Sequence, residues 1–382
     1  MAQPLPKTLL IGSCEPFSGK SAVVLGLMRQ LVSMGLSLRY GKPLATSLDD
    51  LVDPHTGRDD TQTCDDDTKT CVDDDVQFIG SILKLGDEQL LPSLQALNVD
   101  SALARLLTGE LEQQARLALE AVISQLQASS AADLVLLEAA GSLQEGMLYG
   151  LSLVQLALGL QAPVLLVHPW SDARSVEPLL EARQQFGDLL AGVVLNGVPP
   201  DEVNSLREEL VPALERLGIH VYGVLPRSPL LRSVTVEELV GRLNARVLCC
   251  QERQDLLVET LSIGAMNVNS AMEFFRRRRN MAVVTGADRT DIQLAALEAS
   301  TQCLILTGVG EPLPQLINRA EELDVPLLKV EHDTLTTVEV IERAFGHVRL
   351  HESVKATYAI RLVEEHCRFQ PLLERLKLAV PV

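Results

Sequence analysis

Short apolar runs alternate with amphipathic stretches along most of this sequence. Runs such as 134–137 and 163–167 are continuously apolar and are bounded by small or polar residues, which predicts strands buried on both faces of a sheet. Stretches such as 21–31 and 201–217 repeat their apolar positions every three or four residues, which predicts helices. Strands that alternate with helices predict an α/β fold built on a doubly wound parallel sheet.

The pattern predicts a large first domain over residues 1–248. Residues 88–128 carry helical patterns, and 49–75 lacks apolar periodicity and contains eleven Asp, which is typical of a solvated charged insertion. The strands expected in this domain are 8–11, 38–44, 133–142, 163–168, 192–198 and 220–226, and the other helices expected are 21–31, 76–85, 172–190 and 201–217.

A second, smaller α/β domain is predicted over residues 255–355. Residues 227–259 are expected to be largely helical, with polar 251–255 as a linker, and a C-terminal helix is expected over 356–382, kinked or split by Pro371. The strands expected in the second domain are 260–266, 281–286, 302–308 and 326–330, and the helices expected are 270–279, 292–299 and 312–323.

The junction between the first strand and the first helix carries the strongest chemical signal. Gly12 ends the apolar run, and Ser18-Gly19-Lys20-Ser21 opens the helix, so backbone N–H groups at the helix start face an anion. Lys20 is expected to reach nucleotide phosphates, and the Ser21 hydroxyl to bind Mg²⁺. The spacing differs from the common pattern, since six residues separate Gly12 and Gly19. The alternative is an ordinary strand-to-helix turn with a capping Ser.

Other candidate residues follow the predicted strands of the first domain. Ligands of parallel sheets bind beyond the carboxyl ends of the strands, where Lys42, Glu138, Asn196 and Pro226 are expected to gather near Lys20. Glu138 is a candidate Mg²⁺ ligand there, and the alternative is a capping or loop acid. Asp75, just before the helix expected at 76–85, is a second candidate Mg²⁺ ligand.

Composition narrows the choice of partners and compartment. A net charge of −18 argues against nucleic acid or an anionic membrane as a partner, because both are polyanions. Seven scattered Cys do not form a secreted disulfide framework, and no apolar run reaches membrane-spanning length. A cytoplasmic protein is therefore expected. Cys64 and Cys71 are interpreted as two free thiols, with pairing under oxidation as the alternative.

These motifs support a resemblance to known families. Residues 1 to about 245 resemble the dethiobiotin-synthetase-like P-loop domain, most closely its variant at the N-terminus of long bacterial phosphotransacetylases. The second domain resembles a DRTGG domain. The motifs that carry the resemblance are Gly12 to Ser21, Gly41-Lys42-Pro43, Leu137-Glu138-Ala139-Ala140-Gly141, Val194-Leu195-Asn196-Gly197-Val198, Gly223-Val224-Leu225-Pro226 and Thr285-Gly286-Ala287-Asp288-Arg289-Thr290-Asp291.

The resemblance implies roles for particular residues. It places Lys20 and Ser21 at the phosphates and Mg²⁺ of ATP or a related nucleotide, Lys42 near the transferred phosphate, and Asn196 near the base. It also implies self-association, a homodimer through the DRTGG domain. Dethiobiotin synthetases have Gly where this chain has Ala139, and their phosphate loop lacks Glu15 and Pro16.

Three functions remain open from the sequence. The first is a nucleotide-binding regulatory or sensory protein that acts through a partner or through self-association. The second is an ATP-dependent enzyme of the dethiobiotin-synthetase type that acts on a small carboxylate, with Lys20 and Lys42 as catalytic residues. The third is a structural or assembly subunit with a decayed nucleotide site. Acetyl transfer is expected to have no site in residues 1–382, because the large catalytic domain of phosphotransacetylases is not among them.

Overall fold

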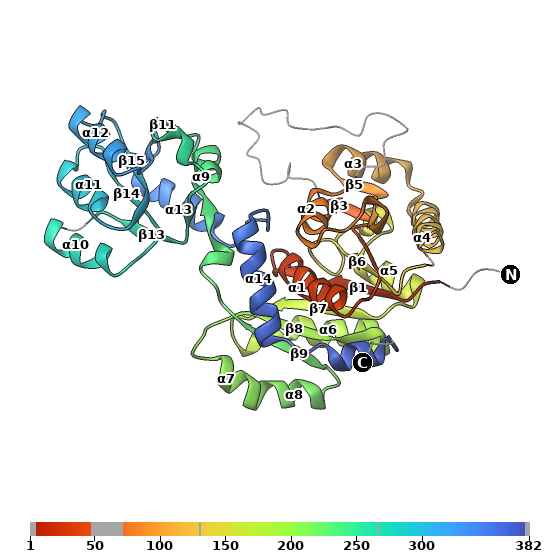
Figure 1. The fold of residues 1–382 in the computed structure, drawn as a ribbon. Helices are drawn as coiled ribbons and strands as arrows, with labels where there is room; N and C mark the ends of the chain where they lie inside the picture. Colours follow the sequence, from red (N-terminus) through yellow and green to blue (C-terminus); the bar gives the residue numbers. More distant parts are fainter. Residues whose placement is uncertain (1–4, 47–71, 130, 266, 379–382) are drawn as a thin grey trace. The chain divides into compact units, whose positions relative to one another are not determined.

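The computed structural model describes residues 5–46, 72–129, 131–265 and 267–378. These residues form two compact units (Figure 1). The first unit combines the described residues up to 227 with the C-terminal segment from residue 350 onward, and the second comprises the described residues of 228–349. The chain therefore leaves the first unit, builds the second, and returns to the first.

The first unit contains a seven-stranded sheet with the strand order β4-β2-β6-β1-β7-β8-β9. All of its strand pairs are parallel, so the carboxyl ends of the strands meet at one edge. The strands are β1 (Thr8–Gly12), β2 (Leu38–Gly41), β4 (Leu90–Leu91), β6 (Leu134–Glu138), β7 (Val164–Pro169), β8 (Leu190–Val198) and β9 (Val221–Pro226). A separate parallel pair joins β3 (Leu44–Thr46) to β5 (Gln95–Leu97).

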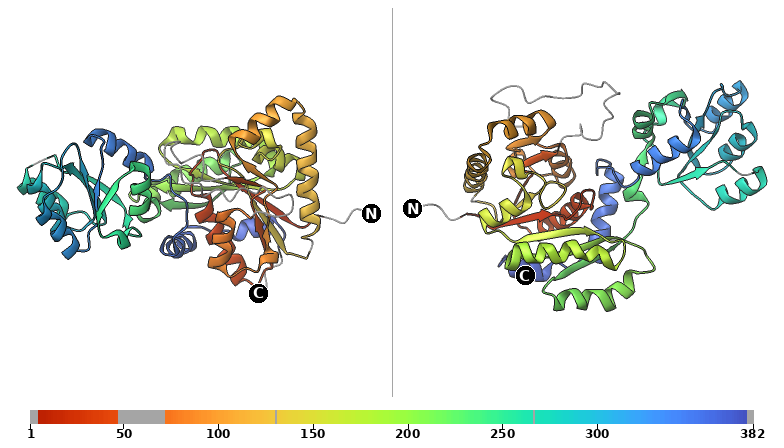
Figure 2. Two further views of the ribbon diagram at one scale, coloured as in Figure 1. Left: turned by 90° about the horizontal axis from the view of Figure 1, so that it is seen from above. Right: turned by 180° about the vertical axis from the view of Figure 1, so that it is seen from behind.

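Helices cover both faces of this sheet (Figure 2). Alternate residues of the buried strands point to opposite faces; Leu10 of β1 joins the core under α4, α5 and α6. On the other face, α1 packs on α14, and Val363 of α14 lies where a side chain at Gly26 of α1 would be. The helices are α1 (Lys20–Ser33), α2 (Asp74–Leu83), α3 (Val99–Thr108), α4 (Leu111–Gln127), α5 (Leu153–Leu160), α6 (Glu177–Phe186), α7 (Val203–Ser205), α8 (Val211–Arg216), α14 (Ser353–His366) and α15 (Gln370–Arg375).

The second unit contains a five-stranded sheet with the order β11-β16-β15-β14-β13. Only the β11–β16 pair of this sheet is antiparallel. Its strands are β11 (Arg246–Cys249), β13 (Thr260–Ile263), β14 (Met281–Gly286), β15 (Thr301–Thr307) and β16 (Leu327–Lys329), and a short pair joins β10 (Val234–Thr235) to β12 (Leu257–Val258). Its helices are α9 (Val236–Leu243), α10 (Val268–Arg276), α11 (Thr290–Leu297), α12 (Pro314–Glu322) and α13 (Thr334–Ala344).

Strand alternation also builds the two cores of the second unit. Val283 of β14 packs toward α10, α11 and α12, whereas its neighbour Val284 packs toward α9 and α13. A strand whose alternate side chains pack into two different cores must be apolar at every position. The sequence shows this pattern at 281–284.

The predicted fold class is confirmed: helices flank mostly parallel sheets in both units. The helical prediction for 227–259 was wrong at three places, because β10, β11 and β12 lie in that stretch. Part of 88–128 was also wrong, since β4 and β5 precede α3. Strands of two to four residues are too short to show a periodicity of their own.

The expected break at Pro371 is confirmed, because α14 ends at His366 and Pro371 lies in the first turn of α15. No helix among the described residues is long and apolar enough to cross a membrane. The predictions for Cys64, Cys71 and most of the Asp-rich 49–75 stretch fall outside the described residues.

Candidate functional site

The loop between β1 and α1 lies at the carboxyl edge of the first sheet. Gly19 caps α1 in the left-handed conformation (φ 86°), where a Cβ would also lie 2.3 Å from the Asn196 amide nitrogen. Only Gly fits both conditions. The Asn196 amide donates a hydrogen bond to the Ser18 carbonyl oxygen (2.8 Å), so the end of β8 holds the loop in place.

Ser13 and Ser18 fix the inner side of this loop. The Ser13 hydroxyl lies 2.8 Å from the Glu15 carbonyl oxygen and 2.7 Å from the Gly141 carbonyl oxygen, and it accepts a hydrogen bond from the Lys20 ammonium group (3.1 Å). The Ser18 hydroxyl is buried and has no hydrogen-bond partner among the residues that the structure describes. An unpaired buried hydroxyl is costly, so Ser18 fits a ligand that brings a hydrogen-bonding oxygen into the loop.

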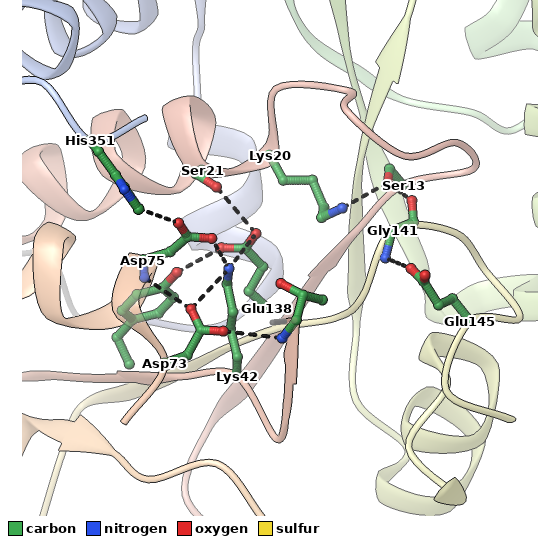
Figure 3. Close-up of polar contacts among 12 residues, drawn as sticks. Ser13, Lys20, Ser21, Lys42, Asp73, Asp75, Glu138, Gly141, Glu145 and His351 are labelled. Carbon is green, nitrogen blue, oxygen red and sulfur yellow. Dashed lines mark hydrogen bonds and ion pairs between the residues drawn. The ribbon is translucent and has the colours of Figure 1, made fainter. Parts of the chain in front are cut away.

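A cluster of charged side chains, the Lys42 cluster, lies beside the loop (Figure 3). The ammonium group of Lys42 forms an ion pair with Asp75 and lies 3.3 Å from Asp73 and 3.8 Å from Glu138. Each of these four side chains is less than a tenth exposed. Glu138 also accepts hydrogen bonds from the hydroxyl groups of Ser21 (3.4 Å) and Tyr40 (2.6 Å).

Local structure explains how these residues reach the cluster. Lys42 follows β2, and Glu138 ends β6, the strand between β2 and β1. Asp73 caps α2 by accepting a hydrogen bond from the Asp75 N–H (3.0 Å), so both carboxylates belong to the start of that helix. Acidic residues are stable there because the amino end of a helix carries partial positive charge.

Burial and charge shift the pKa values of the basic and phenolic groups. Burial lowers the pKa of Lys42, but the carboxylates of the cluster outweigh it and raise the pKa above its usual value. Burial lowers the pKa of Lys20, and the attraction of Glu138 offsets this only in part. Burial, followed by the charge of Glu138, raises the pKa of Tyr40 well above 10. Burial raises the pKa of the Cys14 thiol to about 12, so this loop cysteine stays protonated at neutral pH.

The site residues predicted from sequence fall into three groups. Ser21, Lys42, Asp75 and Glu138 belong to the Lys42 cluster and its margin, and Gly12, Ser18, Gly19, Lys20 and Asn196 build the loop. Pro226 stands apart, because it ends β9, three strands from β1 and therefore roughly 14 Å away.

Sequence reasoning missed Ser13, Tyr40 and His351, and it considered Asp73 only as part of the acidic run that contains Asp75. His351 Nε2 lies 2.8 Å from Asp75 Oδ1, although 276 residues separate the two. Asp73 lies in the acidic run that drew attention to Asp75, and its position before an expected helix was the available signal. Tyr40 occupies an apolar position of a predicted strand, so the sequence indicates a core residue there. The residues next to His351 in the sequence form no motif that indicates a functional site.

The chemistry of the donor set fits a magnesium ion only in part. Mg²⁺ in nucleotide sites is held by one or two protein oxygens together with phosphates and water; Ser21 and Glu138 supply such oxygens side by side. Both oxygens of Asp75 already have partners, in Lys42 and His351. Within the described ranges, no group of three or more His, Cys, Asp or Glu is arranged to hold a metal ion.

Comparison with known families agrees with this architecture. Residues 7–235 match the AAA domain family and residues 238–344 match the DRTGG domain family. The first match covers more than half of the chain, and the chain belongs to this AAA domain family. The resemblance to a P-loop domain followed by a DRTGG domain is thereby confirmed.

Curated relatives carry the name phosphate acetyltransferase. One from Synechocystis is 24% identical over 98% of this chain and 52% of its own length. Another from Nitratidesulfovibrio vulgaris is 25% identical over 97% of this chain and 52% of its own length. The chain thus spans about half the length of these relatives.

Solved structures resemble parts of the chain weakly. The CBS and DRTGG domains of the regulatory region of Clostridium perfringens pyrophosphatase, solved with the activator diadenosine tetraphosphate, match at 22% identity and a TM-score of 0.27, over 31% of this chain and 51% of that one. The signal recognition particle receptor FtsY from Elizabethkingia anophelis matches at 16% identity and a TM-score of 0.33, over 59% of this chain and 61% of that one.

Proposed function

We propose that this member of the AAA domain family binds Mg²⁺-ATP, or a related nucleotide, in its first unit and acts as a regulatory or sensory protein. The observation that carries the proposal is the loop itself: Lys20 and the unpaired Ser18 hydroxyl lie where α1 begins, with Ser21 and Glu138 alongside. Backbone N–H groups at a helix start and a nearby ammonium group are the donors that phosphates require.

The charges of the site favour a metal–nucleotide complex over the bare nucleotide. Two lysines, Lys20 and Lys42, face four carboxylates in and around the cluster, those of Asp73, Asp75, Glu138 and Glu145. A triphosphate adds negative charge, so Mg²⁺ is needed to offset it, and Ser21 and Glu138 would hold the ion. In this proposal Lys20 leaves the Ser13 hydroxyl and binds the phosphates, while Asn196 keeps the loop in shape.

The Lys42 cluster disfavours the alternative of phosphoryl transfer to a small carboxylate. Such an enzyme needs a cation that accepts the substrate, and Lys42 is already held by Asp73, Asp75 and Glu138. A regulatory role needs no such cation. The buried Ser18 hydroxyl in turn disfavours a decayed site, because it costs stability while no ligand is bound and has no partner among the described residues.

Calorimetric titration of Mg²⁺-ATP tests the proposal. Wild-type protein is expected to bind, and Lys20→Ala to bind on the order of a hundredfold more weakly, since losing a buried charged partner costs about 2–5 kcal/mol. Lys7→Ala is the matched control, because Lys7 is exposed and directly precedes β1, at the end of that strand away from the phosphate loop. Absence of binding by the wild type would refute the proposal.

The rate of ATP hydrolysis distinguishes a regulatory role from an enzymatic one, and the preference for ATP over GTP tests the role of Asn196. Negligible ATP hydrolysis, with or without added small carboxylic acids, supports the regulatory role, whereas acid-dependent hydrolysis would establish the enzyme. Asn196→Ala is expected to weaken ATP and GTP binding equally, because Asn196 holds the loop. A loss confined to ATP would instead place Asn196 at the base.

We also propose that the second unit mediates self-association. The proposal rests on the match of residues 238–344 to the DRTGG domain family and on the resemblance stated for it. Sedimentation velocity with and without Mg²⁺-ATP measures the oligomeric state. A monomer under both conditions would leave a separate protein partner as the route of signalling.

A further inference from the structure

The segment that returns from the second unit brings a histidine to the Lys42 cluster. The second unit ends at Arg349, and His351 is the second residue of the C-terminal segment of the first unit. Its Nε2 donates a hydrogen bond to Asp75 Oδ1 (2.8 Å), as Figure 3 shows. Its ring also lies 5.6 Å from the Phe78 ring of α2. Two contacts with one helix thus define the ring position.

The residues that follow His351 are anchored on the first unit. Lys355 is fully buried in the first turn of α14 and pairs with Glu352 (3.0 Å). Further along α14, Val363 packs against α1, the helix that begins at the phosphate loop. In the sequence, His351 therefore comes just after the last residue of the second unit and just before α14, which is anchored on the first unit. A movement of the chain where it leaves the second unit would reach His351 before it reaches α14.

A continuous series of contacts connects His351 to the phosphate loop. Asp75 uses Oδ1 for His351 and Oδ2 for Lys42. Lys42 in turn lies 3.8 Å from Glu138, whose carboxylate faces the Ser21 hydroxyl at the start of α1 (3.4 Å). His351 and Lys42 thus hold the two oxygens of the same carboxylate.

We propose that His351 is a positioning residue that fixes Asp75 against Lys42 and thereby couples the segment leaving the second unit to nucleotide affinity in the first. This inference rests on the proposed function, because it concerns the affinity of that site. Binding linkage is reciprocal, so the nucleotide also restrains residues 350–352 when it binds.

The first experiment tests the contact without nucleotide. Nitrogen-15 NMR of labelled histidines is expected to show His351 protonated at Nε2, with a signal that shifts in Asp75→Asn, since an amide is a weaker acceptor than a carboxylate. A His351 signal that is identical in both proteins would overturn the inference, whatever the protein binds.

The second experiment measures Mg²⁺-ATP affinity in paired variants. His351→Leu keeps an apolar contact with Phe78 but removes the donor, and about tenfold weaker binding is expected, the effect of one hydrogen bond to a charged group. His351→Gln restores a donor and is expected to bind like the wild type. His332→Ala is the control, because His332 is an exposed histidine of the second unit.

The third measurement follows backbone hydrogen exchange at residues 350–352. Mg²⁺-ATP is expected to slow it in the wild type and His351→Gln but not in His351→Leu, although the phosphate loop is protected in all three. Equal affinity or equal exchange in His351→Leu and the wild type would overturn the inference while the proposed function stands. A wild type that fails to bind Mg²⁺-ATP would refute the proposed function, and this inference with it.

Discussion

The carboxyl edges of the parallel strands differ in chemistry between the two sheets. At the first sheet, Lys42 is buried among three carboxylates, and Lys20 donates to the Ser13 hydroxyl across the loop. At the second sheet, Thr285 and Thr307 donate to neighbouring carbonyl oxygens, and Lys329 binds the carbonyl oxygens of Gly308 and Val330. A parallel sheet thus provides an edge where ligands can bind, and the side chains at that edge decide whether charge is concentrated there.

The sharpest test of this difference removes the lysine from each edge. Lys42→Met leaves three buried carboxylates without their cation, and a loss of about 3–5 kcal/mol in the free energy of unfolding of the first unit is expected. Lys329→Met removes two hydrogen bonds from an ammonium group to carbonyl oxygens, and a smaller loss of about 2 kcal/mol is expected for the second unit.

The single tryptophan allows the two units to be followed separately. Trp170 follows β7 and is buried, so its fluorescence during urea unfolding reports on the first unit, while circular dichroism reports on both. Equal losses in the two variants would show that the Lys42 cluster has no special electrostatic role.

The second test compares a glycine at each edge. Gly19 and Gly308 both have positive φ, at 86° and 80°, so an Ala at either position costs about 1 kcal/mol in backbone strain. Only Gly19→Ala also meets Asn196, at 2.3 Å, whereas no atom of the described residues lies within 4 Å of a Cβ at Gly308. Gly19→Ala is therefore expected to cost roughly twice as much stability and to abolish Mg²⁺-ATP binding.

Stability and calorimetric titration of both glycine variants check this prediction. Gly308→Ala is expected to bind Mg²⁺-ATP like the wild type. If Gly19→Ala also bound normally, the close approach of Asn196 to the loop would not be needed for nucleotide binding.

The local part of the site could be predicted from sequence, and the long-range part could not. Gly19, Lys20 and Ser21 are adjacent, so strand, loop and helix signals identify them together. Glu138 could be placed because it ends a strand of the same parallel sheet. The contact between Asp75 and His351 depends on how the chain returns after the second unit, which no local pattern records.

The smallest expected effect is a difference in pH dependence between two buried hydroxyl groups. Tyr40→Phe removes a donor to Glu138, and Thr307→Val removes a donor to the Thr285 carbonyl oxygen; each is expected to cost about 1 kcal/mol at pH 7. Of these two hydroxyl groups, only the Tyr40 phenol loses its proton in the alkaline pH range. Its pKa is raised above 10 in the folded protein, so the unfolded chain loses this proton first as the pH rises.

Tyr40 therefore stabilises the folded protein fully below pH 10, and this contribution is lost as the pH rises from 10 toward the raised pKa. Tyr40→Phe is expected to flatten the fall of first-unit stability above pH 10, by up to about 1.4 kcal/mol per pH unit, whereas Thr307→Val leaves the slope unchanged. Urea unfolding at pH 7 to 11, followed by Trp170 fluorescence and circular dichroism, measures both slopes. Equal slopes for wild type and Tyr40→Phe would mean that neither burial nor the charge of Glu138 raises the pKa of Tyr40 in the folded protein. The contrast between the two edges would then rest on Lys42, Asp73 and Asp75 alone.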